Sequence, residues 1–343
     1  MTPSPSSPPA RAKSSVEQGL AGGIAGAASV VLLHPLDVVK VRMQVQGHRD
    51  PGTLQTARQY YYTSTPQALS AIARSEGYRA LYAGVAPAVV GGTLAWGTYF
   101  AAYEACKGVW RRSTTSSTLT KSHDARDQST APRLSPAAHL ACAAVAGAAV
   151  CGVTNPLWVV KTRLQLQSSG SGGGGGAATR GVPYRGLFHG LRTLLMEEGV
   201  RGCYSGLAPN LVLVSHGALQ FMAYEELKHW CGGGRSQITP LEAGAAGMAS
   251  KLFASVTTYP NQVLRSRMQQ RRSVGSESLT LGGTAAALWR AEGLRGFYRG
   301  IGPSVLRVLP ASGVTFLVYE SVLGAIEQIS CPSSTATASS VSV

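Results

Sequence analysis

Charged residues are scarce in this sequence of 343 residues, since they make up 14% of it, against about 25% in an ordinary soluble domain. Acidic residues are the scarcer kind, with 16 Asp and Glu against 31 Lys and Arg, a formal net charge of +15. Glycine is abundant, with 41 residues. Few charges and many small residues favour helices packed in lipid, where small side chains let backbones approach closely. The positive balance suits nucleic acid, anionic lipid or an anionic solute as a partner.

Several catalytic, metal-binding and targeting signals are missing. The six cysteines form no C-x-x-C pair and no His stands at zinc-finger spacing, so we expect packed, reduced thiols and no metal. The glycine run at 172–176 is not followed by Gly-Lys-Ser/Thr, and no Ser/His/Asp set converges, so neither a phosphate loop nor an enzyme is predicted. Residues 1–15 are rich in Pro and Ser without the apolar core of a secretory signal, which predicts a disordered tail.

Three sequence signals recur in the same order three times. The first is a proline motif that begins Pro-Leu or Pro-Asn and ends in Gln, at 35–44, 156–165 and 260–269. The second is a glutamate–glycine motif, at 76–84, 198–206 and 292–300. The third is an apolar stretch that ends in Tyr-Glu, at 103–104, 224–225 and 319–320. This order predicts three copies of a two-helix unit of roughly 100 residues.

Long apolar runs accompany the repeated signals. About 15–18 apolar or small residues precede each motif proline, near the roughly 20 that a helix needs to span a bilayer. The second runs of the three units stand at about 87–108, 208–229 and 303–327. We therefore predict an all-α membrane protein with six transmembrane helices. A soluble helix bundle is the alternative, but so few charges would hardly cover six such runs with polar surface.

Polar segments mark the boundaries of the units. We expect disordered tails at 1–15 and 329–343, and a linker at 111–135. The three units then occupy 16–110, 136–231 and 236–328, with a flexible glycine-rich insertion at 168–182.

The pattern Pro-x-[Asp/Glu]-x-x-[Lys/Arg]-x-[Lys/Arg]-x-Gln, followed by Glu-Gly-x4-aromatic-x-Gly, covers about 16–327 in three copies and resembles the mitochondrial carrier family. The resemblance implies six tilted helices in a pseudo-threefold barrel with three short matrix helices. It places the chain in the mitochondrial inner membrane, in contact with lipid including cardiolipin, with both termini toward the intermembrane space. One central site would face either side in turn. One barrel per chain makes a monomer sufficient.

The resemblance also implies a matrix gate of ion pairs between successive proline motifs. Its positions correspond to Asp37, Lys40, Trp158, Lys161, Gln262 and Arg265, braced by Gln44, Gln165 and Gln269. Asp37 is expected to meet Lys161, whereas Trp158 leaves Arg265 without an ionic partner and Gln262 offers Lys40 only a hydrogen bond. One ion pair in place of three predicts a weak gate that opens readily, with Trp158 compensating by packing.

A second gate on the cytoplasmic side corresponds to Glu104, Lys107, Glu225, Lys228 and Glu320. Glu104 is expected to meet Lys228, and Glu320 to meet Lys107. Leu323 occupies the third basic position, which leaves Glu225 unpaired. The alternative for these charges is that they are merely solvated at helix ends.

The substrate site of the resemblance lies in the middle of the membrane. It corresponds to Gly91, Trp96, Val212, Ser215, His216, Gln220, Lys251 and Arg307. Lys251 stands nine residues before Pro260, which is about 13 Å along an ideal helix, so it falls inside an apolar span where an ionisable residue is functional by default. The alternatives are a structural or lipid-facing role for Lys251 and simple packing for Trp96 and His216.

The cargo follows from these charges. Lys251 and Arg307 have no matching acid at their level, which favours an anionic solute, and Trp96 suits a planar ring. The runs 92–104, 154–163, 215–228 and 250–260 look like the folate/FAD branch of the family. Folate or FAD is therefore the predicted cargo, with NAD, pyrimidine-nucleotide and adenine-nucleotide carriers, mitochondrial or peroxisomal, as alternatives. No nucleic acid is expected, because its binding needs basic residues on a wettable face.

Overall fold

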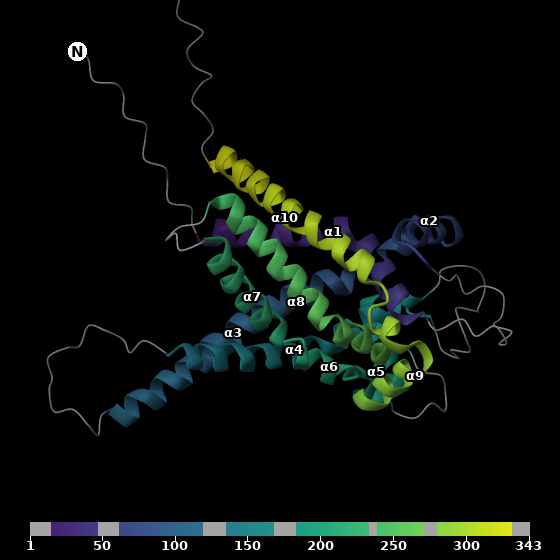
Figure 1. Ribbon diagram of the computed structural model, residues 1–343, viewed down its shortest axis with the longest axis horizontal. Helices are drawn as coiled ribbons and strands as arrows, with labels where there is room; N and C mark the ends of the chain where they lie inside the picture. The colour runs from purple at the N-terminus through teal and green to yellow at the C-terminus, as the bar shows by residue number, and fades with distance from the viewer. Residues whose placement is uncertain are drawn as a thin grey trace, which may run out of the picture. The chain divides into compact units, whose positions relative to one another are not determined.

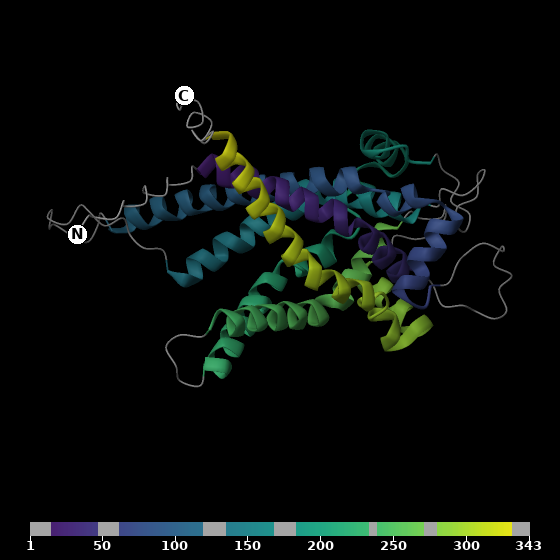
Figure 2. The ribbon, with the colours of Figure 1, turned by 90° about the horizontal axis from the view of Figure 1, so that it is seen from above.

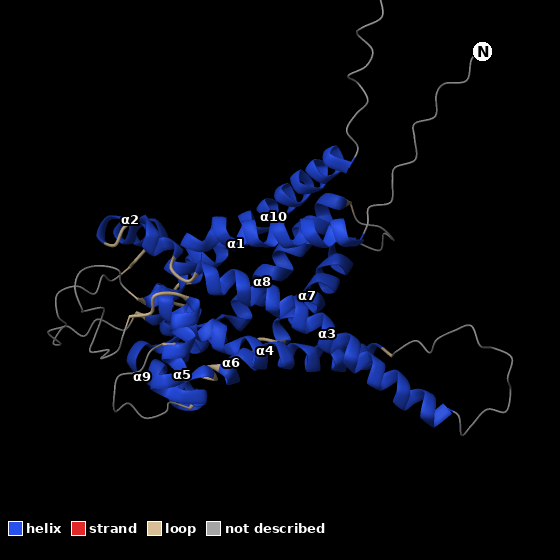
Figure 3. Ribbon diagram, turned by 180° about the vertical axis from the view of Figure 1, so that it is seen from behind, coloured by secondary structure: helices blue, strands red, loops and turns tan. Residues whose placement is uncertain are grey.

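The structure of the protein, a computed structural model, describes residues 15–46, 62–118, 135–167, 183–232, 239–270 and 280–330. Nearly all of this described part is helical and it contains no strand (Figure 3). The predicted all-α class is therefore confirmed for these residues. The chain divides into two compact units, one of residues 33–308 and one of the two chain ends, 1–32 and 309–343. The site described below lies wholly within residues 33–308.

Each repeat contributes a long helix that contains the motif proline, a short helix, and a second long segment (Figure 1). The first repeat comprises α1 (Ser15–Val45), α2 (Thr65–Ser75), the 3-10 helix η1 (Tyr78–Tyr82) and α3 (Val85–Thr118). The second comprises α4 (Pro136–Leu166), α5 (Leu187–Cys203), α6 (Leu207–Val212) and α7 (Ser215–Gly232). The third comprises α8 (Pro240–Gln269), α9 (Leu281–Phe297) and α10 (Ile301–Ser330). Helix α3 continues through 111–118, which the sequence had assigned to a linker.

Local capping residues fix where the helices of the later repeats begin. Ser135 accepts a hydrogen bond from the backbone of Ala138 at the start of α4. Thr239 and Glu242 form a reciprocal capping box at the start of α8. These side chains satisfy backbone N–H groups that have no partner inside the helix, so the helix starts are encoded within a few residues of sequence.

Three helical segments of the described chain are long and apolar enough to cross a membrane. They are Ala21–Val45, Tyr78–Trp110 and Ala137–Leu166. Helix α8 carries Glu242, Lys251 and Arg265 along its length, which lowers its mean hydropathy. The chain therefore shows three apolar spans, and the other three of the six predicted spans stay a prediction.

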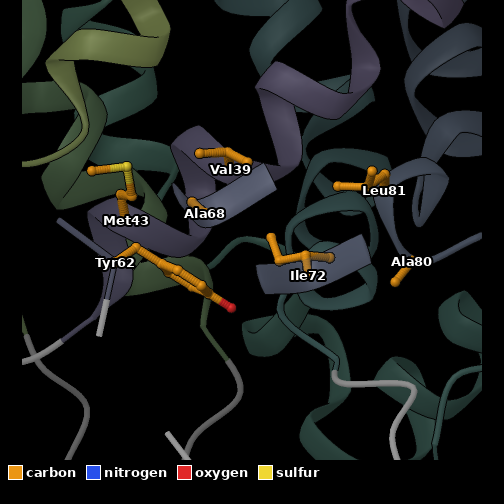
Figure 4. Close-up of a cluster of buried hydrophobic side chains, with 7 residues drawn as sticks. All are labelled: Val39, Met43, Tyr62, Ala68, Ile72, Ala80 and Leu81. Carbon is orange, nitrogen blue, oxygen red and sulfur yellow. The ribbon is translucent and has the colours of Figure 1, made fainter. Parts of the chain in front are cut away.

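The long helices pack in pairs within residues 33–308. Helices α3 and α4 lie side by side, as do α7 and α8 (Figure 2). Helix α2 and η1 cover the last turns of α1 and bury an apolar cluster of Val39, Met43, Tyr62, Ala68, Ile72, Ala80 and Leu81 (Figure 4). Equivalent clusters join α4 to α5 and α8 to α9. Burial of side chains such as Ile72 and Leu194 stabilises each short helix by about 1.5–3 kcal/mol per side chain.

The last glycine of each glutamate–glycine motif sits where one repeat touches the next. Gly84, Gly206 and Gly300 have φ of 81°, 74° and 80°, a region that side-chain-bearing residues rarely adopt. A Cβ atom on Gly84 would lie 3.0 Å from the carbonyl oxygen of Lys161, and one on Gly206 would lie 3.2 Å from that of Arg265. Only glycine allows this close approach, which brings each repeat against the following proline-motif helix.

Candidate functional site

A ring of arginines joins the three repeats at the ends of α1, α4 and α8. Arg42 donates to both carboxylate oxygens of Glu76 in its own repeat, at 2.6 and 2.8 Å. Its Nε also donates to the backbone oxygen of Gln165 in the second repeat, at 2.9 Å. One side chain therefore ties a short helix to its own repeat and its own repeat to the next.

The same arrangement recurs around the ring. Arg163 pairs with Glu198 at 2.7 and 2.8 Å and donates to the backbone oxygen of Gln269 at 3.2 Å. Arg267 pairs with Glu292 at 2.6 Å and donates to the backbone oxygen of Gln44 at 3.0 Å, which closes the ring on the first repeat. Sequence reasoning gave these arginines and glutamates no role, although each belongs to a repeated motif.

The three bracing glutamines lie just inside this ring and are almost fully buried. Ser266 donates to the side-chain oxygen of Gln44 at 2.7 Å, and Thr162 donates to that of Gln269 at 2.9 Å. The equivalent position of the first repeat is Val41, which has no hydroxyl. Neither side-chain polar atom of Gln165 has a hydrogen-bond partner within the described chain. One of the three braces is therefore incomplete.

The residue before each motif proline holds the short helix of its own repeat. His34 Nε2 lies 2.9 Å from the backbone oxygen of Ala83. Asn155 donates to the backbone oxygens of Cys203 at 2.7 Å and Ser205 at 3.3 Å. The Tyr259 hydroxyl donates to the backbone oxygen of Arg299 at 3.1 Å. These buried residues were also missed, although each places a hydrogen-bonding side chain directly before a proline.

A charge network centres on Asp37, whose side chain is 8% exposed. Lys161 Nζ lies 3.6 Å from one carboxylate oxygen and Arg307 Nη1 lies 2.9 Å from the other. Nearby, Lys40 donates to the side-chain oxygen of Gln262 at 2.8 Å. The structure thus brings together the residues that the sequence assigned to the matrix gate, and their action as a gate stays a prediction. The contact of Arg307, which the sequence had placed in the substrate site, was not expected.

Trp158 takes the place of an acid in this network. Its ring centroid lies 5.1 Å from Lys161 Nζ and 5.5 Å from Arg265 Cζ. Its indole N–H donates to Thr154 at 3.0 Å. A cation–π contact contributes about 0.5–1 kcal/mol when exposed and about 2 kcal/mol when desolvated. The aromatic ring therefore replaces a carboxylate as the neighbour of two cations, which is a more specific role than packing.

Gly91 lies beside the same ring. A Cβ atom at Gly91 would lie 3.8 Å from two atoms of the Trp158 ring. Gly91 is buried, and the absence of a side chain at this position lets the backbone of α3 approach the indole closely.

The remaining residues predicted for the substrate site lie on α3, α7 and α8. Ser215, at the start of α7, donates to the backbone of Val212 at 2.7 Å, and His216 Nδ1 lies 3.0 Å from the Thr258 hydroxyl. Lys251 is partly buried on α8. Gln220 is partly buried on α7.

Trp96 is exposed on α3, with its ring centroid 5.8 Å from that of Phe100 in a stacked geometry. A cavity of about 620 Å³ lies away from these residues and is lined in part by Gln46, Tyr62, Arg299 and Gly300. None of the residues predicted for the substrate site lines it.

The residues of the predicted cytoplasmic gate are arranged differently. Glu104 pairs with Lys107 of its own helix at 2.6 Å, and Lys107 also lies 5.4 Å from the ring centroid of Tyr103. Glu225 and Lys228 are exposed on α7, and within the described residues Glu104 makes no ion pair with Lys228. Glu320 belongs to the other compact unit, so its pairing with Lys107 stays a prediction.

Metal ligation has no support in the part of the chain that the structure describes. No three His, Cys, Asp or Glu side chains gather there as they would around a metal ion. The contacts described above are made by cations, one carboxylate and an aromatic ring.

Fold and site together define a membrane protein of three helical repeats, tied into a ring by arginine side chains that donate to backbone oxygens of the next repeat. The sequence profile of the family described as "Mitochondrial carrier protein" matches residues 11–114, 132–234 and 236–328. The chain belongs to this family.

Individual relatives agree with this assignment. The chain is 43% identical to "Folate transporter 1, chloroplastic" of Arabidopsis thaliana, over 91% of this chain and 96% of that protein. It is 36% identical to an uncharacterized mitochondrial carrier of Schizosaccharomyces pombe, over 90% and 96%. It is 34% identical to "Nicotinamide adenine dinucleotide transporter 2, mitochondrial" of Arabidopsis thaliana, over 90% and 79%.

Proposed function

We propose that this chain is a transporter that moves an anionic heterocyclic cofactor, folate or FAD, across an organelle membrane. The observation that carries the proposal is the excess of cations around Asp37. Four cations lie in the described part of this network. Lys161 and Arg307 contact the Asp37 carboxylate, Lys40 contacts the Gln262 amide, and Arg265 contacts the Trp158 ring. Such a concentration of positive charge attracts an anionic solute, and no nucleic acid, enzyme reaction or resident cofactor is part of the proposal.

The proposed architecture is a monomeric pseudo-threefold barrel of six membrane spans and three short matrix helices. The closed ring of Arg42, Arg163 and Arg267 supports threefold order, because each repeat bonds the next in one direction. Contacts with lipid, cardiolipin included, are part of the proposal, and the family match and the three apolar spans support a membrane setting for them.

Alternating access is the proposed mechanism. The matrix-side network around Asp37 is engaged, whereas Glu104 pairs within its own helix instead of with Lys228. This combination suits a carrier that is closed on the matrix side and open on the other side. Transport would then separate Asp37 from Lys161 while Glu104 reaches Lys228.

The cargo would meet the site through complementary chemistry. Arg307 and Lys251 would bind its anionic groups, and Trp96 would stack on its planar ring. Gly91, Val212, Ser215, His216 and Gln220 would shape the remaining wall. Folate is favoured because a folate transporter is 43% identical over most of both chains, and NAD is the second candidate because NAD transporters are 34–35% identical.

Reconstitution in liposomes tests the proposed function. Labelled folate, FAD, NAD and nucleoside triphosphates are offered to vesicles with the purified protein, and empty vesicles serve as the control. Saturable uptake of folate or FAD is expected, and Arg307→Ala and Lys251→Ala should abolish it while the protein stays folded. Saturable uptake of NAD alone would overturn the folate and FAD assignment.

The proposed location is the mitochondrial inner membrane, with both termini toward the intermembrane space. The relatives include proteins named as mitochondrial and as chloroplastic, and a peroxisomal membrane is the alternative location. Fractionation of cells that express a tagged chain, followed by protease protection of the tag, tests location and orientation together.

A further inference from the structure

Two cations of the matrix network have no carboxylate partner in the described chain. Of the three positions where the repeated motif has an acid, only the first keeps one, Asp37. Lys40 meets the neutral side-chain amide of Gln262, and Arg265 meets the indole ring of Trp158. Asp37 itself is shared between Lys161 and Arg307. The network therefore gathers four positive charges around one negative charge.

This imbalance is unfavourable in a partly buried place. Lys40 and Arg265 are both partly buried, and like charges gathered in one network disfavour each other's charged form. A buried charge requires a counter-charge or strong hydrogen bonds to offset its loss of hydration. An amide and an aromatic ring provide only part of this counter-charge, since neither carries a negative charge and a desolvated cation–π contact contributes about 2 kcal/mol. A further buried atom of the network, Nε of Arg307, also has no hydrogen-bond partner in the described chain.

We propose that an anionic group of the cargo replaces the missing carboxylates, so that Lys40 and Arg265 form a second anion subsite at the level of the matrix gate. The inference rests on the proposed function, because it requires an anionic cargo. Its ligand is a carboxylate or phosphate at one end of an elongated molecule whose other end reaches the aromatic part of the site. Lys40 lies on α1 and Arg265 on α8, so the bound anion bridges two repeats. Carboxylates at positions 158 and 262 would bridge neighbouring repeats in the same way, but Trp158 and Gln262 occupy these positions.

The subsite predicts that this carrier distinguishes its cargo by the number of anionic groups. A molecule with a distal anionic group fills the subsite and neutralises the network. A shorter analogue leaves Lys40 and Arg265 uncompensated and binds more weakly. The gate residues and the cargo site are then parts of one binding surface. The contact between Arg307 of the predicted cargo site and Asp37 of the predicted gate already connects the two.

Gln262→Glu is the sharpest test, because it changes charge with almost no change of shape. Its carboxylate would lie where the amide oxygen now accepts from Lys40 at 2.8 Å, and it would compete with the cargo for that cation. The dissociation constant of folate, measured on purified protein in detergent, should rise about tenfold or more. That of pteroate, which lacks the glutamate part of folate, should change less than about threefold. Gln67→Glu, the same substitution on the exposed face of α2, should change neither.

Arg265→Gln provides the second variant. It should weaken folate binding about tenfold, and Arg265→Lys should keep most of the wild-type affinity. Arg290→Gln, on the exposed face of α9, is the control and should not change folate binding. A parallel arm with NAD and with nicotinamide riboside, which lacks phosphate, decides whether the subsite takes a phosphate in place of a carboxylate. Melting temperatures confirm that each variant is folded.

The outcomes separate this inference from the proposed function. If the wild-type protein transports folate or NAD but Gln262→Glu and Arg265→Gln leave both members of each ligand pair unaffected, the subsite is wrong and the proposed function survives. Equal losses for the long and the short ligand would also overturn the subsite, since the charges would then act on the gate alone. If the wild-type protein binds no anionic cofactor, both proposals fail.

Discussion

The arginine ring and the charge network around Asp37 are both built on α1, α4 and α8, with Arg307 of α10 added to the network, but only the ring keeps its threefold order. In the ring, Arg42, Arg163 and Arg267 make the same two kinds of contact in every repeat. In the network, the three equivalent acid positions hold an acid, an aromatic residue and an amide. A closed ring fails if one link is missing, so every repeat must supply the same residues. The network tolerates different residues at its three equivalent positions, and these residues can therefore determine which cargo is bound and how the gate opens.

The largest effect is expected from breaking one link of the ring. Arg163→Ala removes a side chain that is 1% exposed and leaves Glu198 without its partner. Loss of one member of a buried ion pair destabilises a fold by about 3–5 kcal/mol. Thermal unfolding of the protein in detergent should show a large fall in melting temperature or no folded protein. Arg185→Ala, at an exposed arginine, is the control and should melt like the wild-type protein.

A smaller loss of stability is expected at Tyr259, whose hydroxyl joins Gln44 to the backbone that follows α9. Tyr259→Phe deletes a hydroxyl that donates to the backbone of Arg299 and accepts from Gln44 at 3.1 Å. The two buried partners lose a hydrogen bond, which should lower the free energy of unfolding by about 1–3 kcal/mol. Denaturation of the purified protein measures this loss, with Tyr204→Phe at a half-exposed tyrosine as the comparison. Equal stability of the two variants would show that the Tyr259 hydroxyl is dispensable.

The broken symmetry of the network is tested by restoring an acid. Trp158→Asp should give Arg265 an ionic partner and strengthen the matrix gate by about 1 kcal/mol, or more if the pair is desolvated. Transport should slow several-fold, and a matrix-closed state should become more populated. Uptake rates in liposomes and the protease accessibility of the matrix side report both quantities. Unchanged rates together with unchanged accessibility would refute the idea that this carrier passes readily through a matrix-open state.

The smallest effect is a gain in stability. Val41→Thr supplies the hydroxyl that Thr162 and Ser266 provide in the other repeats, and by the same threefold order it should donate to the unsatisfied Gln165. One added buried hydrogen bond should raise the free energy of unfolding by about 0.5–1.5 kcal/mol. Val38→Thr makes the same change at a fully buried apolar position and should destabilise instead. A fall in melting temperature for Val41→Thr would contradict the idea that position 41 faces Gln165 as Thr162 faces Gln269 and Ser266 faces Gln44.

Some contacts of the site could be predicted from the sequence, because equivalent positions of the three repeats are expected to make equivalent contacts. The pairing of Asp37 with Lys161 and the hydrogen bond of Lys40 to Gln262 were expected from motif positions, and both contacts are present at 3.6 and 2.8 Å. Their gating role stays a prediction. The contact of Arg307 with Asp37 was not expected, because a mid-membrane assignment by residue counting carries no information about side-chain reach.

The sequence alone determined the helical class, the three repeats and the positions of the motif prolines. These features depend on local information, namely apolar runs, capping residues such as Ser135 and Thr239, and glycines that no other residue replaces. Only the tertiary structure decided which repeat each arginine of the ring bonds, that Trp158 neighbours two cations, and that Gln165 lacks a partner. The contacts of Arg42 with Gln165 and of Arg265 with Trp158 join residues more than 100 positions apart, so they depend on how the helices pack, which no local pattern records.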